Sequence, residues 1–371
     1  MRPLEGLLVL DFSTLLPGPM ASLILAEAGA RVVKIERPGR GDEMRSYEPK
    51  LGDDSVNFVL LNRGKQSIAI DLKSPDALDR LRPLLARADV VIEQFRPGVM
   101  ERLGLGYAAL SRINPGLIYC SITGWGQTGP KAQTAAHDLN YMAETGVLGL
   151  AAGADGAPVL PPVLAADIAG GTLPAVVNIL LALRQRDQTG QGALLDIAMA
   201  DNMFSFAYWG LGNGFAGAGW PKPGGELVTG GSPRYQIYRT ADGRYLAAAP
   251  LEDKFWENFT GIVDLPEPLR DPAASPAAVI AAVGARIATR DAEAWRAAFA
   301  GQDVCCSIVA TLEEAVADPQ VAARRVFGHI LKINGQELPS LPVPLAPVFR
   351  PDPTRAAAPR HGETQDPLLS I

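Results

Sequence analysis

The sequence predicts an α/β protein, with a doubly wound, mostly parallel sheet in its first part and a smaller α+β domain after it. Short apolar runs alternate with helical stretches along the first 124 residues, which is typical of a parallel sheet. A Gly- and Pro-rich stretch breaks this alternation at 210–232. An Asp-Gly turn at 242–243 then joins two alternating runs, which is the signature of a β-hairpin.

The expected strands of the first part are short apolar runs bounded by turns, over 7–13, 31–37, 67–72, 89–95 and 116–124. Helices are expected between them, over 17–30, 74–88 and 107–114. Because parallel strands are joined by helical crossovers that cover both faces, these elements predict a Rossmann-like large domain. Ligands of such sheets bind beyond the carboxyl ends of the strands.

Two more helices are expected after the sheet, one starting near Asp138 and one over 166–192. The changes in composition then predict four parts: a large domain over 1–205, a linker over 206–232, a small α+β domain over 233–318, and a C-terminal segment over 319–371 that returns to the large domain.

The composition excludes some classes of function. Hydrophobic residues make up 47% and charged residues 20% of the 371 residues, an ordinary globular balance. A net charge of −6 without a basic run argues against a nucleic-acid-binding protein. The chain has only three histidines, and its cysteines have no metal-ligand spacing, so we expect no metal site.

The cysteines and the longest apolar run bear on the compartment. Cys305 and Cys306 are adjacent, and adjacent cysteines are poor disulfide partners, so we expect a reducing, cytoplasmic location. The apolar run 172–184 is expected to be a buried helix that is too short to span a bilayer, and no membrane association is expected.

His137 is the first residue that could carry chemistry, because it directly precedes the helix expected at Asp138. The start of a helix carries a partial positive charge, which favours a neutral imidazole that can accept a proton near pH 7. The alternative is a histidine that only hydrogen-bonds its own loop.

Asp167 lies in a similar position, near the start of the apolar helix and just before Gly170 and Gly171. A plain N-cap is the simpler interpretation of this carboxylate. The two glycines disfavour a helix by about 1 kcal/mol each relative to alanine, so another helix or a ligand must approach this backbone closely. An imidazole and a carboxylate on opposite sides of one carbon could remove and return a proton α to a carbonyl, through an enolate.

Five segments resemble those of α-methylacyl-CoA racemases, which belong to the family III CoA-transferase superfamily. They are VIEQFRPGVMERLGLGY, IAIDLKSPD, GWGQTGPKAQTAAHDLNYMAETGVL, PPVLAADIAGG and GGSPRYQIYRTADGRYLAAAPLEDKFW. The resemblance runs in order from about residue 3 to residue 330. It implies an acyl-CoA racemase that inverts the α-carbon of 2-methylacyl-CoA thioesters, with no cofactor beyond the coenzyme A of the substrate.

The resemblance also implies roles for four residues. His137 and Asp167 match the two acid/base residues of the racemases, and Glu252 matches the carboxylate that orients the histidine. Asp138 matches the residue whose backbone N–H is placed at the thioester oxygen. Without the resemblance, Glu252 would be interpreted as a solvated residue at the start of a helix.

Coenzyme A carries three phosphate groups, so its site should be rich in basic residues in loops after strands. The segments matching NRGK, DLKS and FRPG line the nucleotide site in the family. The resemblance therefore assigns coenzyme A binding to Asn62, Arg63, Lys65, Leu72, Lys73 and Arg96. Arg40 is added as a basic residue in the loop after the strand expected at 31–37.

Two other functions remain open from the sequence. In the CoA-transferases of this superfamily, the aspartate that matches Asp138 attacks the thioester and forms an acyl-enzyme anhydride, and this chain keeps that aspartate. A non-catalytic acyl-CoA-binding protein is the third possibility. The family forms an interlocked homodimer, so the resemblance also implies a homodimer, in which Glu252 could act within one chain or across the two.

Overall fold

The protein is described from a computed structural model, which covers residues 2–153, 155–350 and 355–364. The chain divides into two compact units, and each is described by itself. The first comprises Met1–Thr145, Val163–Phe206 and Ala323–Ile371, and the second comprises Gly146–Pro162 and Ala207–Ala322. The stretch predicted to be a linker thus falls almost entirely within the second unit.

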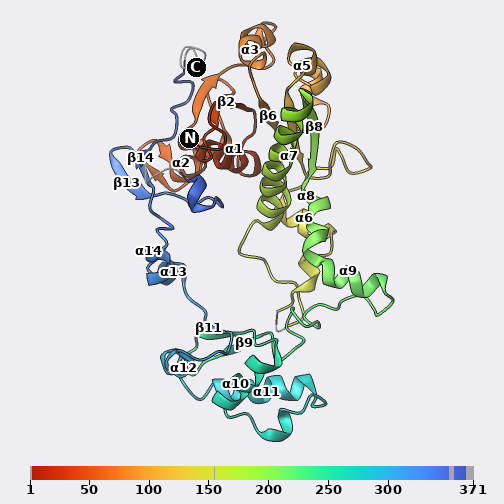
Figure 1. The fold of residues 1–371 in the computed structure, drawn as a ribbon, viewed down its shortest axis with the longest axis vertical. Coiled ribbons are helices and arrows are strands. Elements are labelled where there is room, and N and C mark those ends of the chain that lie inside the picture. The colour runs from red at the N-terminus through yellow and green to blue at the C-terminus, as the bar shows by residue number, and fades with distance from the viewer. Residues whose placement is uncertain (1, 154, 351–354, 365–371) are drawn as a thin grey trace. The chain divides into compact units, whose positions relative to one another are not determined.

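The first unit is built on a six-stranded parallel sheet (Figure 1). Its strand order is β5-β2-β1-β6-β7-β8, with each neighbouring pair parallel. The strands are β1 (Leu8–Asp11), β2 (Arg31–Glu36), β5 (Gln66–Ala69), β6 (Val90–Glu93), β7 (Ile118–Thr123) and β8 (Ala193–Ala198). This order is that of a doubly wound sheet, with a topological switch point between β1 and β6.

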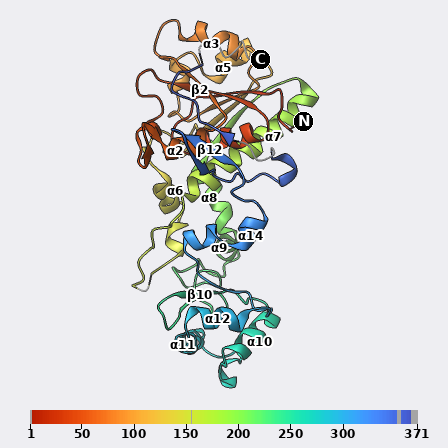
Figure 2. The ribbon, with the colours of Figure 1, turned by 90° about the vertical axis from the view of Figure 1, so that its left-hand side faces the viewer.

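Helices cover both faces of this sheet, and Figure 2 shows α3 and α5 on one side and α7 on the other, where α1 packs against α7. The helices of the first unit are α1 (Pro17–Glu27), α2 (Val56–Asn62), α3 (Ala77–Leu85), α4 (Val99–Arg102), α5 (Tyr107–Ile113), α6 (Asp138–Glu144), α7 (Leu173–Thr189) and α8 (Met199–Met203). Alternate residues of the central strands, such as Leu10 and Val91, pack against Leu81 of α3 and Leu110 of α5 in one buried core. The apolar runs in the sequence are continuous because their strands are buried on both faces.

Residues after Ala323 rejoin the first unit through a small sheet in the order β13-β12-β14. A hairpin joins β12 (Ile330–Ile333) to β13 (Gln336–Pro339), and β14 (Arg355–Ala356) pairs parallel to β12. The two turn residues of the hairpin both have positive φ, with 45° at Asn334 and 79° at Gly335. A short ribbon of β3 (Lys50–Leu51) and β4 (Asp54–Ser55) precedes α2.

The second unit is α+β, with an antiparallel sheet in the order β11-β10-β9. Its elements are α9 (Tyr208–Phe215), β9 (Gln236–Arg239), β10 (Tyr245–Ala248), α10 (Asp253–Ile262), α11 (Pro276–Ile287), α12 (Ala292–Phe299), β11 (Cys306–Ile308) and α13 (Leu312–Val316), with α14 (Pro319–Ala323) at the boundary. Its core gathers Trp256, Phe259, Trp295 and Phe299. The predicted hairpin at the Asp-Gly turn corresponds to β9 and β10.

The helical run Ala166–Thr189 corrects one expectation from the sequence. A π-helical turn at Ala166–Thr172 extends α7 at its N-terminus, so the run is long and apolar enough to cross a membrane by length and composition. Half of its most apolar window is buried within the fold, as in the core helices of water-soluble proteins. The length criterion alone therefore does not separate this helix from a membrane span.

Candidate active site

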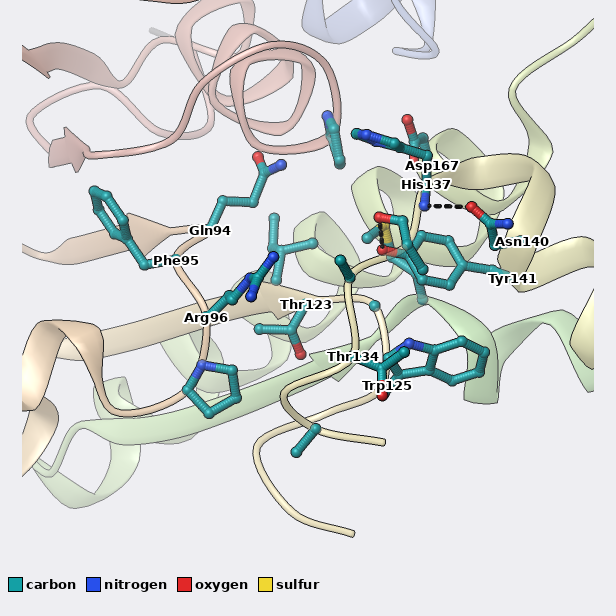
Figure 3. Close-up of a pocket in the computed structure, with 18 of the residues that line it drawn as sticks. Gln94, Phe95, Arg96, Thr123, Trp125, Thr134, His137, Asn140, Tyr141 and Asp167 are labelled. Carbon is teal, nitrogen blue, oxygen red and sulfur yellow. Dashed lines mark hydrogen bonds between the residues drawn. The ribbon is translucent and has the colours of Figure 1, made fainter. Parts of the chain in front are cut away.

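The candidate active site is a cavity of about 430 Å³ at the carboxyl ends of β1, β6 and β7, all within the first unit. Figure 3 shows His137, Asn140, Tyr141 and Asp167 on one side of this cavity, with Gln94, Phe95 and Arg96 on the other side. The switch point of the sheet thus carries the cavity, as expected for an open α/β sheet.

His137 is the N-cap of α6 and is exposed in the cavity. Its backbone N–H donates to Oδ1 of Asn140 at 3.0 Å, so a side chain in the first turn of α6 fixes the backbone of the histidine. The hydroxyl of Tyr141 donates to the carbonyl of Ala136 at 2.8 Å, which fixes the residue just before the histidine. Asn140 and Tyr141 therefore fix the backbone around His137.

Asp167 lies in the π-helical turn that opens α7, and it lines the same cavity. Single π-helical turns are rare and are found frequently at functional sites. Gly170 and Gly171 of this turn are buried against α8. A Cβ on Gly170 would lie 2.6 Å from the carbonyl oxygen of Met199, so the close partner that the glycines require is another helix.

Asp138 connects the two acid/base candidates. Its side chain is 4% exposed, and its Oδ1 accepts the backbone N–H of Asp167 at 2.9 Å. Burial is the main cause that raises the pKa of Asp167, and the charge of Asp138 raises it further, to about 6, against a smaller lowering by His137. Asp138 is not among the residues that line the cavity.

A second cavity, of about 440 Å³, adjoins the first and is lined by loops after β1, β2, β5 and β6. Thr14 and Phe95 line both cavities and form their shared wall. The predicted coenzyme A residues Leu72 and Lys73 lie here, together with Arg102, which was not predicted. Arg102 follows Arg96 by six residues in the same segment after β6, so its basic side chain was a signal that could have been used.

The other predicted coenzyme A residues lie in different places. Arg96 lines the first cavity, and Arg40 lines a third cavity of about 540 Å³ that is rich in arginine and lysine. Asn62, Arg63 and Lys65 line none of these three cavities, since all three side chains are buried.

Contacts within the fold occupy these three buried side chains. Arg63 pairs with Glu27 at 2.7 Å and donates to the carbonyl of Leu341 at 2.7 Å. Lys65 donates to Oδ1 of Asn62 at 2.8 Å and pairs with buried Asp11 at 3.3 Å. Their assignment to coenzyme A therefore rests on the resemblance alone.

Glu252 belongs to the second unit, where it is the exposed N-cap of α10. Arg234 holds this corner of the chain, since its guanidinium donates to the carbonyl of Leu251 at 2.9 Å and to Asp253 at 2.6 Å. The pairing of Glu252 with His137 stays a prediction.

Comparison with known proteins decides the family. The model of CoA-transferase family III matches residues 4–365. The chain belongs to this family. This agrees with the resemblance found in the sequence. The α/β fold is shared with a solved CAIB/BAIF family protein from Brucella suis and with Rv3272 from Mycobacterium tuberculosis.

Relatives of this family III chain carry two kinds of activity. It is 35% identical to human "Alpha-methylacyl-CoA racemase", with 94% of this chain and 90% of the racemase covered. It is 36% identical to mouse "Succinyl-CoA:glutarate CoA-transferase", over 73% of this chain and 62% of the transferase. A crystal structure of a CAIB/BAIF family protein from Brucella suis superposes with a TM-score of 0.83 at 30% identity, covering 98% of this chain and 97% of that one.

Proposed function

We propose that the protein is an acyl-CoA racemase that inverts the α-carbon of 2-methylacyl-CoA thioesters. One observation carries the proposal: His137 and Asp167 line one cavity, while the carboxylate of Asp138 is buried and hydrogen-bonded to the backbone of Asp167. The two groups that a racemase needs are thus available to a substrate, and the nucleophile that a transferase needs is engaged elsewhere.

The substrate would bind with its nucleotide end in the 440 Å³ cavity and its thioester in the 430 Å³ cavity, passing Thr14 and Phe95. Lys73 and Arg102 line the 440 Å³ cavity and would face the phosphate groups of coenzyme A. No cofactor beyond the coenzyme A of the substrate takes part in this proposal.

In the forward direction, the neutral imidazole of His137 removes the α-proton, and the electron pair of the C–H bond moves into the thioester to form an enolate. The protonated carboxyl of Asp167 then returns a proton to the opposite face of the α-carbon, which inverts it. The reverse reaction exchanges the two roles. Because the pKa of Asp167 is raised, chiefly by burial, to about 6, both protonation states are accessible near neutral pH. By resemblance, the enolate oxygen would accept the backbone N–H of Asp138, which directly follows His137; because Asp138 is not among the residues that line the cavity, this contact stays a prediction.

CoA transfer is the alternative, supported by the transferase relatives and by the presence of Asp138. For that reaction, Asp138 would have to give up the N–H of Asp167 and turn toward the cavity. The two mechanisms therefore make opposite demands on this one carboxylate.

An Asp138→Asn variant separates the two functions. Asparagine keeps an oxygen that can accept the N–H of Asp167, so a racemase should retain inversion of a 2-methylacyl-CoA within about tenfold. A transferase should lose all activity, because an amide cannot form the anhydride. The measurement is chiral analysis of the thioester in buffer without any acceptor acid, alongside CoA transfer to added carboxylic acids. Transfer by the native protein, or trapping of Asp138 by hydroxylamine, would reject the racemase assignment.

A homodimer also belongs to this proposal, and an apolar face of α7 supports it. Val177 is 54% exposed and Leu181 is 62% exposed, with Leu173 and Leu180 exposed beside them. Exposed apolar patches of this kind mark association surfaces. Sedimentation velocity should give twice the mass of one chain, and Leu181→Glu should lower it. A monomeric native protein at micromolar concentration would contradict the dimer.

A further inference from the structure

The loop of residues 13–17 forms part of the wall between the two cavities. It follows β1 and carries Thr14, which lines both cavities, and Leu15, which lines the first. Leu15 has a φ of 62°, in the left-handed region that is costly for a residue with a bulky side chain. Such a conformation persists only where the surroundings enforce it.

A buried ion pair between Asp42 and Lys34 enforces this backbone conformation of Leu15. Oδ1 of Asp42 accepts the backbone N–H of Leu15 at 3.1 Å and that of Met44 at 3.0 Å. Its Oδ2 lies 2.9 Å from Nζ of Lys34, and both side chains are fully buried. Lys34 in turn donates to the carbonyl of Ser13 at 2.7 Å, so the pair holds the loop at Ser13 and at Leu15, on both sides of Thr14.

A residue of the parallel sheet, Glu36, holds Asp42 in place. The backbone N–H of Asp42 donates to Oε2 of Glu36, the last residue of β2, at 2.9 Å. Asp42 also lies in the loop that lines the second and third cavities. One carboxylate therefore connects the basic loop after β2 with the wall of the cavity that contains His137 and Asp167.

We propose that Asp42 is a positioning residue for the acyl-CoA substrate, fixing the loop 13–17 through Lys34 and Leu15 so that a thioester seated by its nucleotide end presents its α-carbon to His137 and Asp167. This inference rests on the proposed racemase function. Removal of the carboxylate frees the wall shared by the two cavities, and a displacement of about 1 Å at a reacting centre can lower a rate by about 10²-fold.

The test compares Asp42→Ala with Asp42→Asn. Asparagine keeps an oxygen for the N–H groups of Leu15 and Met44 but removes the charge that pairs with Lys34. It should therefore lose stability to denaturant, while the kcat for inversion of its folded fraction stays within about fivefold of the native value. Alanine loses both acceptors, so its kcat should fall by about 10²-fold, and its Kd for coenzyme A, measured by calorimetry, should rise about tenfold.

A matched control is Asp89→Ala, at the other end of the sheet. Asp89 also accepts a backbone N–H, from Leu8 at 2.7 Å, and pairs with Arg186 at 2.9 Å. This variant should lose stability to denaturant while its folded fraction keeps the native kcat and Kd. An Asp42→Ala protein that behaves like Asp89→Ala would overturn the proposal.

If Asp42→Ala does not fold, the Lys34→Met/Asp42→Asn double variant leaves no unpaired buried charge and still removes the donor to Ser13. Its kcat should fall about tenfold, and a kcat within twofold of the native one would reject the proposal. If the native protein shows no inversion, the proposed function fails, and the Kd for coenzyme A of the same variants still decides whether Asp42 positions the ligand.

Discussion

Replacement of Asp167 by asparagine is expected to abolish inversion of a 2-methylacyl-CoA, with a loss of about 10³-fold or more. General acid–base groups contribute about 10²–10⁴-fold each, and inversion in either direction needs both partners. Asparagine has nearly the shape of aspartate but neither donates nor accepts a proton at neutral pH. The measurement is chiral chromatography of the thioester after incubation with either enantiomer.

A two-base mechanism predicts a further result for this variant in heavy water. His137 lines the cavity independently of Asp167, so it should still exchange deuterium into the one enantiomer whose α-proton faces it. His137→Ala should show the converse, with exchange into the other enantiomer only. Exchange into both enantiomers by either variant, or inversion above a tenth of the native rate, would contradict the assignment of these two residues.

The same Asp167→Asn variant should also be more stable than the native protein at pH 8. The folded-state pKa of Asp167 is raised, mainly by burial, from 3.8 to about 6, so the folded state holds this proton more tightly than the unfolded state. The free energy of unfolding of the native protein therefore falls as pH rises from about 4 to about 6. The variant does not lose stability in this way, because asparagine does not titrate. The gain should be about 1–3 kcal/mol at pH 8 and close to zero at pH 4, measured by urea unfolding.

Much of the fold follows from local pattern. Five strands of the parallel sheet, β5 at one edge and the four central ones, were predicted because most of their residues are buried and so form continuous apolar runs in the sequence. The strand β8 was not predicted, because its first four residues alternate between half-buried and exposed at an edge of the sheet, with Leu194 50% exposed. The hairpin of β12 and β13 was also missed, although Asn334-Gly335 is a strong turn signal of the kind recognised at 242–243.

The site was less predictable because tertiary contacts build it. The sequence separates His137 from Asp167 by 30 positions, and the hydrogen bond from Asp167 to Asp138 spans this gap in the fold. The buried charged side chains were harder to predict than His137 and Asp167. Charged residues are almost never fully buried unless they are paired. Lys65 was assigned to the phosphate groups of coenzyme A by the resemblance, whereas its side chain is buried. Its carboxylate partner comes from β1, 54 positions away.

Gly170→Ala is expected to lower kcat by about 10²-fold while changing no group that takes part in chemistry. The added Cβ would lie 2.6 Å from the carbonyl oxygen of Met199, a backbone atom that no rotamer change can move away. The π-helical turn must therefore shift away from α8 and carry Asp167 with it. A shift of about 1 Å is enough for a loss of this size. Overpacking should also cost about 1–3 kcal/mol of stability, measured by denaturant unfolding.

Two neighbouring cases control this prediction. A Cβ on Gly171 would meet the side chain of Met199 at 3.0 Å, and a flexible thioether can move, so Gly171→Ala should have a much smaller effect. Gly261 lies in α10 with no atom within 4 Å of its Cβ position, so Gly261→Ala should leave activity unchanged. Equal losses from Gly170→Ala and Gly171→Ala would mean that the turn tolerates no substitution at all. A native rate in Gly170→Ala would show that the position of Asp167 does not depend on its packing against α8, and the case for a carboxyl group held in place for proton transfer would fail with it.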